Sequence, residues 1–149
     1  MKLPKVTAGT PKAFFAKSPF AFLDSGDSAR VIASIREGLP AQAIDFLAER
    51  LSLARATLLQ TIKIPLSTIE RRMRTGESLS AEESDRVSRV AKVLYRAMTV
   101  LGDETQATAW MRSAVTSLGG HTPLSLLDTM EGYELVTNTL SRIEFGVYG

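Results

Sequence analysis

Residues 80–101 predict the longest helix of the chain, and this helix constrains the fold more than any other feature. The segment begins with Ser80, followed three residues later by Glu83, which is the pattern of a capping box. Apolar residues then recur at spacings of three and four until Gly102 ends the pattern. They are Val87, Val90, Ala91, Leu94, Tyr95, Met98 and Leu101. Such a helix is stable when other helices cover its stripe, so we expect an all-α compact helical bundle.

Shorter helices are predicted on both sides of this one. Residues 29–37 are followed by Gly38, and residues 40–51 carry a proline at the first helical position. After Gly102, Asp103 or Glu104 begins a further helix, whose inward side chains are expected to be Ala107, Trp110, Met111 and Ala114. Connections this short favour one bundle of six to eight helices.

The N-terminal residues 1–28 are expected to form an arm. Prolines 4, 11 and 19 prevent a continuous helix. The arm is nonetheless rich in phenylalanine, which is unusual for a solvated tail. We expect its aromatic side chains to pack on the body of the protein or on a second subunit; they are Phe14, Phe15, Phe20 and Phe22.

The composition excludes several classes of protein. There is no cysteine, and the single histidine, His121, stands beside two glycines, where a surface or capping role is expected. Glu82 and Glu83 are neighbours at a helix start and do not form a catalytic pair across a cleft. There is no phosphate-binding loop and no nucleophile elbow. We therefore expect no enzyme activity, no cofactor, no metal and no small-molecule substrate.

No apolar run in the sequence approaches the length of a membrane span, so no membrane partner is expected. The lack of cysteine suits the cytoplasm, which is where we place the protein. Charge is unevenly distributed along the chain. Residues 51–80 hold five basic and two acidic side chains, a net charge of +3, and residues 103–149 hold two basic and six acidic ones, a net charge of −4. Two different partners would explain this contrast, and so would chance.

Residues 53–74 predict a helix-turn-helix. The first helix covers residues 54–62, Lys63, Ile64 and Pro65 form the turn, and the second helix covers residues 66–73 with Ile69 and Met73 facing inward. The start of such a second helix reaches base edges, while its arginines bind guanine or phosphate. The candidate DNA-binding residues are Lys63, Leu66, Ser67, Thr68, Arg71, Arg72 and Arg74.

Two residues depart from the usual helix-turn-helix pattern. Lys63 occupies the turn position that usually holds glycine, and a left-handed conformation there costs about 1 kcal/mol. Leu59 replaces the small residue that lets the two helices approach each other. An ordinary helical hairpin with a solvated basic face is the alternative interpretation.

The last segment, residues 118–149, carries the most specific pattern. Gly119 and Gly120 break a helix, and Thr122 and Pro123 open a short apolar turn. Asp128 or Thr129 then caps a final helix, whose apolar stripe is Tyr133, Val136, Leu140 and Ile143. The sequence closes on the apolar residues Phe145, Val147 and Tyr148. This tail either docks on its own domain or binds a partner.

An ordered series of residues in this segment resembles the C-terminal toxin-binding domain of Xre/MbcA/ParS-type antitoxins. The series is Trp110-Met111, Leu118-Gly119-Gly120, Thr122-Pro123-Leu124, Leu127-Asp128-Thr129, Gly132, Val136, Leu140, Arg142-Ile143 and Gly146. The upstream half resembles the helix-turn-helix of the same family, so the resemblance covers residues 30–149. It implies an antitoxin that neutralises a RES-domain toxin, which degrades NAD, and that represses its own operon.

In this family, antitoxin residues close the substrate pocket of the toxin. Here the acidic, apolar end of the chain suits a basic NAD-binding pocket. The candidate toxin-binding residues are Glu131, Glu134, Arg142, Glu144, Phe145, Val147, Tyr148 and Gly149. The competing interpretation is that Phe145, Val147 and Tyr148 fold back on Trp110 and the long helix.

The expected organisation is therefore an arm (1–28), a helix-turn-helix half (29–79) and a toxin-binding half (80–149). The expected partners are a RES-domain toxin, operator DNA and a second copy of the chain, since a dimer reads paired half-sites. One alternative is a stand-alone helix-turn-helix repressor whose C-terminal domain only dimerises. Another is an adaptor that binds no DNA.

Overall fold

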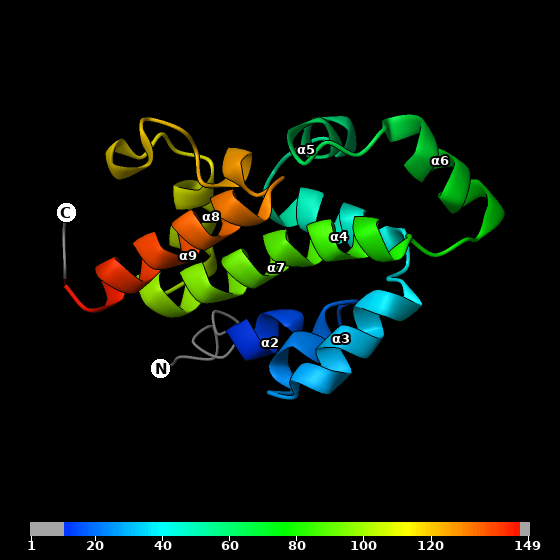
Figure 1. Cartoon of the computed structure of the whole chain (residues 1–149), viewed down its shortest axis with the longest axis horizontal. Coiled ribbons are helices and arrows are strands. Elements are labelled where there is room, and N and C mark those ends of the chain that lie inside the picture. Colours follow the sequence, from blue (N-terminus) through cyan, green and yellow to red (C-terminus); the bar gives the residue numbers. More distant parts are fainter. Residues whose placement is uncertain (1–10, 147–149) are drawn as a thin grey trace, which may run out of the picture.

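The computed structural model describes residues 11–146, apart from the side chains of Ala13 and Phe14. Every regular element in this range is helical, which confirms the predicted all-α fold (Figure 1). The α-helices are α2 (Pro11–Phe15), α3 (Ser28–Glu37), α4 (Gln42–Arg50), α5 (Arg55–Thr61), α6 (Leu66–Thr75), α7 (Ala81–Leu101), α8 (Glu104–Met111) and α9 (Met130–Glu144). Three short 3-10 helices join them: η1 (Ala21–Asp24), η2 (Thr116–Leu118) and η3 (Leu124–Leu126).

Helix α7 is the axis of the bundle, with α2, α3, α4, α8 and α9 packed around it (Figure 1). Its predicted capping box is present, because the Ser80 hydroxyl accepts from the Glu83 N–H at 3.1 Å and the Ser80 N–H donates to the Glu83 carboxylate at 2.9 Å. Gly102 ends the helix at a φ of 108°, which a side chain would strain. The apolar stripe between these ends is buried at Val87, Val90, Ala91, Leu94 and Met98 and partly buried at Tyr95 and Leu101.

The segment expected to be an arm belongs to the core where it is described. Pro11 occupies the first position of α2, where a missing N–H costs nothing. Phe15 and Phe20 are fully buried, and the Phe15 ring stacks on Tyr95 of α7 with centroids 5.6 Å apart. Packing on the body is thus correct for Phe15 and Phe20. The side chain of Phe14 lies outside the described residues.

Helix α8 is shorter than the sequence pattern indicates. Asp103 caps it by accepting from the Gln106 N–H at 2.8 Å, and it ends at Met111. Ala107 and Met111 are buried and Trp110 is partly buried, as expected, but Ala114 follows the end of the helix and is exposed. The inward placement of Ala114 was therefore wrong, because the helical period stops before that residue.

Helix α9 returns along α7 and closes the bundle. Thr129, one of the two predicted caps, accepts from the Gly132 N–H at 3.0 Å. A side chain at Gly132 would collide with the carbonyl oxygen of Leu126, so only glycine lets η3 lie against this first turn. Val136 and Leu140 are fully buried against α7. The division of the chain at residue 79 remains a prediction.

Candidate functional site

Helices α5 and α6 form the predicted helix-turn-helix, and the turn has the geometry that the sequence indicated. Lys63 adopts the left-handed conformation with φ at 64°. The Ile64 N–H donates to the Leu59 carbonyl at 2.9 Å, which is the long hydrogen bond of a Schellman motif. Leu59 and Ile64 are both buried, as apolar residues at these two positions of the motif usually are. The large side chain at Leu59 is thus part of the turn rather than an obstacle to it.

A side chain from α7 supports this turn. Arg86 donates from Nη1 to the carbonyl oxygens of Ile62 at 3.3 Å and Lys63 at 2.8 Å. These carbonyls belong to the C-terminal end of α5, where a guanidinium also complements the helix dipole. Arg86 therefore fixes the turn that aims α6, and the sequence pattern alone did not single it out.

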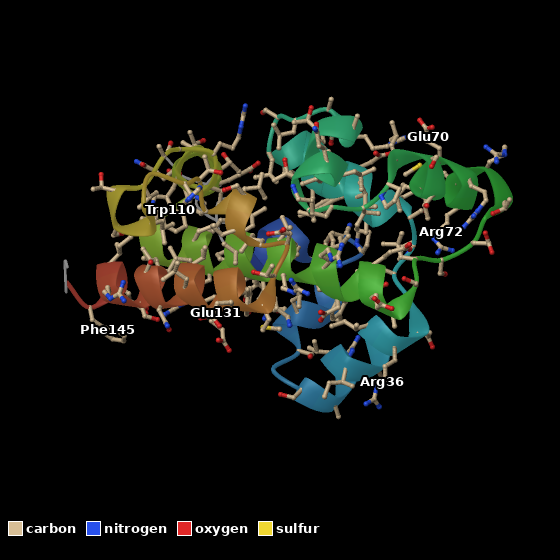
Figure 2. The ribbon with its side chains drawn as sticks, turned by 45° about the horizontal axis from the view of Figure 1, so that its top comes forward. Arg36, Glu70, Arg72, Trp110, Glu131 and Phe145 are labelled. Atoms are coloured by element: carbon tan, nitrogen blue, oxygen red, sulfur yellow. The ribbon has the colours of Figure 1, made fainter. Side chains whose placement is uncertain are left out.

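The N-terminal part of α6 presents several of the predicted DNA-binding residues. Lys63, Ser67, Arg71 and Arg74 are exposed, and Thr68 is partly exposed. Pro65 precedes the helix, and no described side chain caps its first N–H groups. An uncapped helix N-terminus suits phosphate oxygens, and the exposed Arg71 and Arg74 follow in the second half of the helix. Glu70 shares the exposed side, so the surface combines basic and acidic groups (Figure 2).

Two of the predicted DNA-binding residues face elsewhere. Leu66 is partly buried and packs against the hydrophobic core. Arg72 points to α7, donating from Nε to Glu83 Oε1 at 2.8 Å and from Nη2 to Oε2 at 3.2 Å. Both side chains of this pair are only 16% exposed. Arg72 therefore holds α6 in place instead of forming part of its exposed surface.

Glu83 is at the centre of this arrangement. Its carboxylate completes the capping box of α7 and also receives both hydrogen bonds from Arg72. Burial alone would raise its pKa, but hydrogen bonds from Arg72 and Ser80 outweigh that effect and lower the pKa of Glu83. One residue later, the Ser84 hydroxyl accepts from the Leu39 N–H at 2.9 Å. The first turn of α7 thus links α6 to the segment between α3 and α4.

The predicted toxin-binding residues of α9 share one exposed side of that helix. Glu131 and Phe145 project from the same side of α9 near its two ends (Figure 2). Glu134 and Arg142 are also exposed, and the successive spacings of three, eight and three residues place all four side chains on one side of the helix. Phe145 is 75% exposed. This set of residues will be called the α9 face.

The α9 face also includes two apolar residues that were not predicted, Met130 and Leu135. Met130 is 50% exposed and Leu135 is 41% exposed, although both are large and apolar. Leu135 follows Glu131 by four residues and precedes Arg142 by seven, so it lies between them on the helix surface. That spacing was readable in the sequence, but only the structure shows that no other element covers Leu135. The α9 face therefore carries apolar side chains surrounded by charges.

The remaining predicted toxin-binding residues have other positions. Glu144 turns toward α7 and pairs with Arg96 at 2.5 Å, so its carboxylate is occupied. Phe145 does not fold back on Trp110, contrary to the competing interpretation. Val147, Tyr148 and Gly149 lie outside the described residues.

No group of three histidine, cysteine, aspartate or glutamate side chains in residues 11–146 is placed to hold a metal ion. His121 is exposed and takes part in the turn between η2 and η3 through its backbone. No helix in the same range is long and apolar enough to cross a membrane.

Two family models match the chain, and each covers one of the surfaces described above. The helix-turn-helix domain of Xre-like antitoxins matches residues 30–92, and the C-terminal toxin-binding domain of Xre/MbcA/ParS antitoxins matches residues 96–146. A protein named Antitoxin Xre from Photorhabdus laumondii is 32% identical over 116 residues, which are 77% of this chain and 78% of the relative. The chain belongs to the Xre family of antitoxins.

Other relatives agree with this assignment. An Antitoxin Xre from Yersinia enterocolitica is 31% identical over 119 residues, covering 79% of this chain and 80% of the relative. A protein named Prs ADP-ribosylating antitoxin, from a Sphingobium species, is 25% identical over 126 residues, which are 78% of this chain and 79% of the relative. This Xre-family chain is thus a type II antitoxin with a helix-turn-helix and a toxin-binding domain. The two domains imply that a toxin and operator DNA are its partners. Such partners are those of a regulator.

Proposed function

We propose that this antitoxin covers the active site of a RES-domain, NAD-degrading toxin with its α9 face, and that it represses its own operon through α6. The observation that carries the proposal is the α9 face itself. It exposes Met130, Leu135 and Phe145 beside Glu131 and Glu134, and it lies within the residues matched by the toxin-binding family model.

The chemistry of the α9 face suits a protein partner of basic character. Exposed apolar side chains gain free energy when a partner covers them, at about 25 cal/mol per Å² of buried apolar surface. Large side chains at the centre of an interface supply most of its affinity. A pocket that binds the pyrophosphate of NAD is basic, and Glu131 and Glu134 complement it. Glu131 and Glu134 therefore favour a nucleotide-binding cleft over an acidic partner.

NAD as the toxin's substrate has support from a relative as well as from the resemblance. The name of the Sphingobium relative refers to ADP-ribosylation, and that reaction consumes NAD as the ADP-ribose donor. A toxin that hydrolyses NAD and a toxin that transfers ADP-ribose both need a pocket for the same anionic dinucleotide. The α9 face is complementary to the pocket of either toxin. A measurement of cellular NAD would show which of the two kinds of toxin is present.

Operator binding is assigned to the exposed side of α6. Of the set predicted from the sequence, Arg72 is excluded because Glu83 holds it, and Leu66 because it packs on the core. Arg71 and Arg74 are the exposed arginines that remain, beside Lys63, Ser67 and Thr68. Arg71 lies 3.9 Å from Glu77 at a half-exposed position, where an ion pair is weak enough to yield to phosphate. One such helix contacts few bases, so we propose that a homodimer reads two half-sites.

Two double variants test the two surfaces against each other. In cells that express the neighbouring gene's toxin, Leu135→Glu with Phe145→Glu is expected to abolish protection, while Arg71→Ala with Arg74→Ala is expected to retain it. Purified, the arginine variant is expected to lose operator affinity and about two units of salt slope per subunit, or about four for the proposed dimer, and the α9 variant is expected to bind DNA normally. Protection by the α9 variant overturns the assignment of that surface. A toxin that leaves cellular NAD unchanged overturns the RES-type mechanism.

A further inference from the structure

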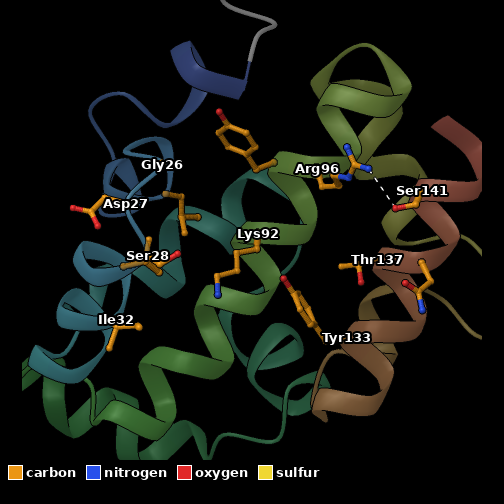
Figure 3. Close-up of a pocket in the computed structure, with 13 residues that line it drawn as sticks. Gly26, Asp27, Ser28, Ile32, Lys92, Arg96, Tyr133, Thr137 and Ser141 are labelled. Carbon is orange, nitrogen blue, oxygen red and sulfur yellow. Dashed lines mark hydrogen bonds between the residues drawn. The ribbon is translucent and has the colours of Figure 1, made fainter. Parts of the chain in front are cut away.

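A groove separates α3 from α9, with α7 as its floor (Figure 3). Its volume is about 710 Å³, within the range of about 300–1,000 Å³ that is typical of binding pockets. The apolar part of its lining consists of Leu23, Val31, Ile32, Tyr95 and Tyr133, and the polar part includes Lys92, Thr137 and Asn138. Nothing in the antitoxin assignment accounts for this groove.

Helix α3 is incompletely covered on the side that faces the groove. None of its residues is fully buried in the described structure, although its sequence is amphipathic and it packs on α7. Val31 is only partly buried, and Ile32 is 48% exposed at the groove edge. A helix with an apolar stripe normally buries it against a neighbour. The uncovered part of α3 therefore favours a partner that enters the groove.

The charges of the groove leave one cation unpaired. Arg96 is bound to Glu144 and Ser141, and Asp27 accepts from the Ala29 N–H as the cap of α3. Lys92 extends from α7 between Ile32 of α3 and Tyr133 of α9 (Figure 3). Its ammonium group has no hydrogen bond or ion pair to any residue that the structure describes. A carboxylate is the group that complements it.

The groove is continuous with the α9 face. Tyr133, Thr137 and Ser141 line the groove, and Asn138 belongs both to the lining and to the exposed side of α9. The side of the groove formed by α9 lies in the stretch that the toxin-binding model matches. Lys92 and α3 from residue 30 onward lie in the stretch that the helix-turn-helix model matches. A toxin seated on the α9 face therefore has the groove directly beside it.

We infer that the groove receives a segment of the toxin that carries an apolar side chain next to a carboxylate. The apolar side chain packs against Ile32 and Tyr133, and the carboxylate pairs with Lys92. The toxin then touches the helix-turn-helix half as well as the toxin-binding half. This inference rests on the proposed docking of the toxin on α9, and it adds a second contact that the α9 face does not require.

The test measures binding of the full-length antitoxin to the toxin encoded by the neighbouring gene, purified in a catalytically inactive form. Ile32→Glu and Lys92→Glu are each expected to weaken binding about tenfold or more, since both oppose the occupant at the groove. Ala33→Glu is the matched control, because Ala33 is exposed on α3 but does not line the groove. It is expected to bind normally. Lys92→Met, which removes the charge but keeps the length, is expected to fall between wild type and Lys92→Glu.

The outcomes separate this inference from the proposed function. Normal toxin binding by Ile32→Glu and Lys92→Glu, together with weak binding by Leu135→Glu, overturns the groove contact and leaves docking on α9 intact. Normal binding by all three variants overturns both. Light scattering and circular dichroism of the free variants complete the test. A loss of dimer mass in Ile32→Glu assigns the groove to a second copy of the chain, and a loss of helicity reveals a folding defect; each result overturns the inference.

Discussion

Arg72 and Glu83 form a two-pronged ion pair that joins the second helix of the helix-turn-helix to the first turn of α7. Their positions in the sequence differ by eleven, and the pair spans the turn around Gly76. Because Glu83 also caps α7, one carboxylate sets both where α7 begins and how α6 lies against it. The position of α6 is therefore tied to the start of α7, the helix on which α9 packs.

Glu83→Gln is expected to destabilise the protein by about 1–3 kcal/mol, because Arg72 loses a charged partner at a mostly buried site. Urea unfolding measures the change, and Glu82→Gln at the preceding, exposed position is the control. The pKa of Glu83 is lowered in the folded protein, so its contribution is complete above the ordinary glutamate pKa and is lost as pH falls through the lowered value. The wild-type protein and Glu83→Gln should therefore converge in stability at acidic pH. An equal effect from both substitutions contradicts this role of Glu83.

Alkaline pH is expected to destabilise the protein through Tyr95. Its hydroxyl donates to Asp24 at 2.7 Å, and this bond raises the pKa of Tyr95 to about 12, with burial and the Asp24 charge adding to the effect. The unfolded chain loses this proton near the ordinary value of 10, so stability falls as pH rises from about 10 to about 12. Tyr95→Phe should flatten that part of the stability curve.

A second tyrosine provides the comparison for Tyr95. Burial raises the pKa of Tyr133 too, with opposing effects from Arg89 and Asp85, but Tyr133 has no hydrogen-bond partner of the Asp24 kind among the described residues. Tyrosinate absorbance in Tyr133→Phe should still show the late-titrating group. Its disappearance in that variant assigns the shifted group to Tyr133 instead of Tyr95.

Lys63→Gly is expected to stabilise the protein by up to about 1 kcal/mol. Lys63 holds a left-handed backbone that glycine adopts without steric cost, although glycine also gives the unfolded chain more freedom. Lys63→Ala loses the same charge and keeps the strained conformation, so it is the matched control. Chemical denaturation of the two variants compares them directly. Equal stability of the two variants contradicts a net gain from glycine at residue 63.

Deletion of residues 145–149 is expected to release toxicity and leave the fold intact. Phe145 is mostly exposed, so its loss removes little packing within the antitoxin. Thermal unfolding of the truncated protein should match that of the full chain, while growth of toxin-expressing cells should fail. Full protection by the truncated protein contradicts a blocking role for the tail. A loss of thermal stability also contradicts that role, because it would show that the tail packs in the core of the antitoxin.

The predictions that the structure confirms rest on local chemistry. Ser80, Asp103 and Thr129 cap helices because their side chains accept from N–H groups two or three residues away, and such patterns are visible in the sequence. The left-handed turn at Lys63 followed from its place between two helical periods. The same reasoning located the exposed side of α9.

The errors involve partners that are distant in the chain or shared between elements. Arg72 looks like a surface arginine in the sequence, and only tertiary packing brings Glu83 to it. Phe15 and Phe20 were expected to pack on the body, but they lie in a stretch interrupted by prolines. No periodicity therefore indicated that Tyr95 and Phe46 would be their neighbours. Leu135 presents the opposite case. Its apolar character suggests burial, and exposure became visible only when no neighbouring element covered it.

The unbroken course of α7 fixes the geometry between the two partners of this antitoxin. Arg86 supports the DNA-binding turn and Arg96 holds α9 through Glu144, ten residues further along one rigid helix. At 1.5 Å per residue the two anchors stand about 15 Å apart. Inserting one residue between them would turn α9 by about 100° around the helix axis relative to α6. In the proposed complex, α7 would therefore hold a toxin on α9 at a fixed distance and angle from an operator bound to α6.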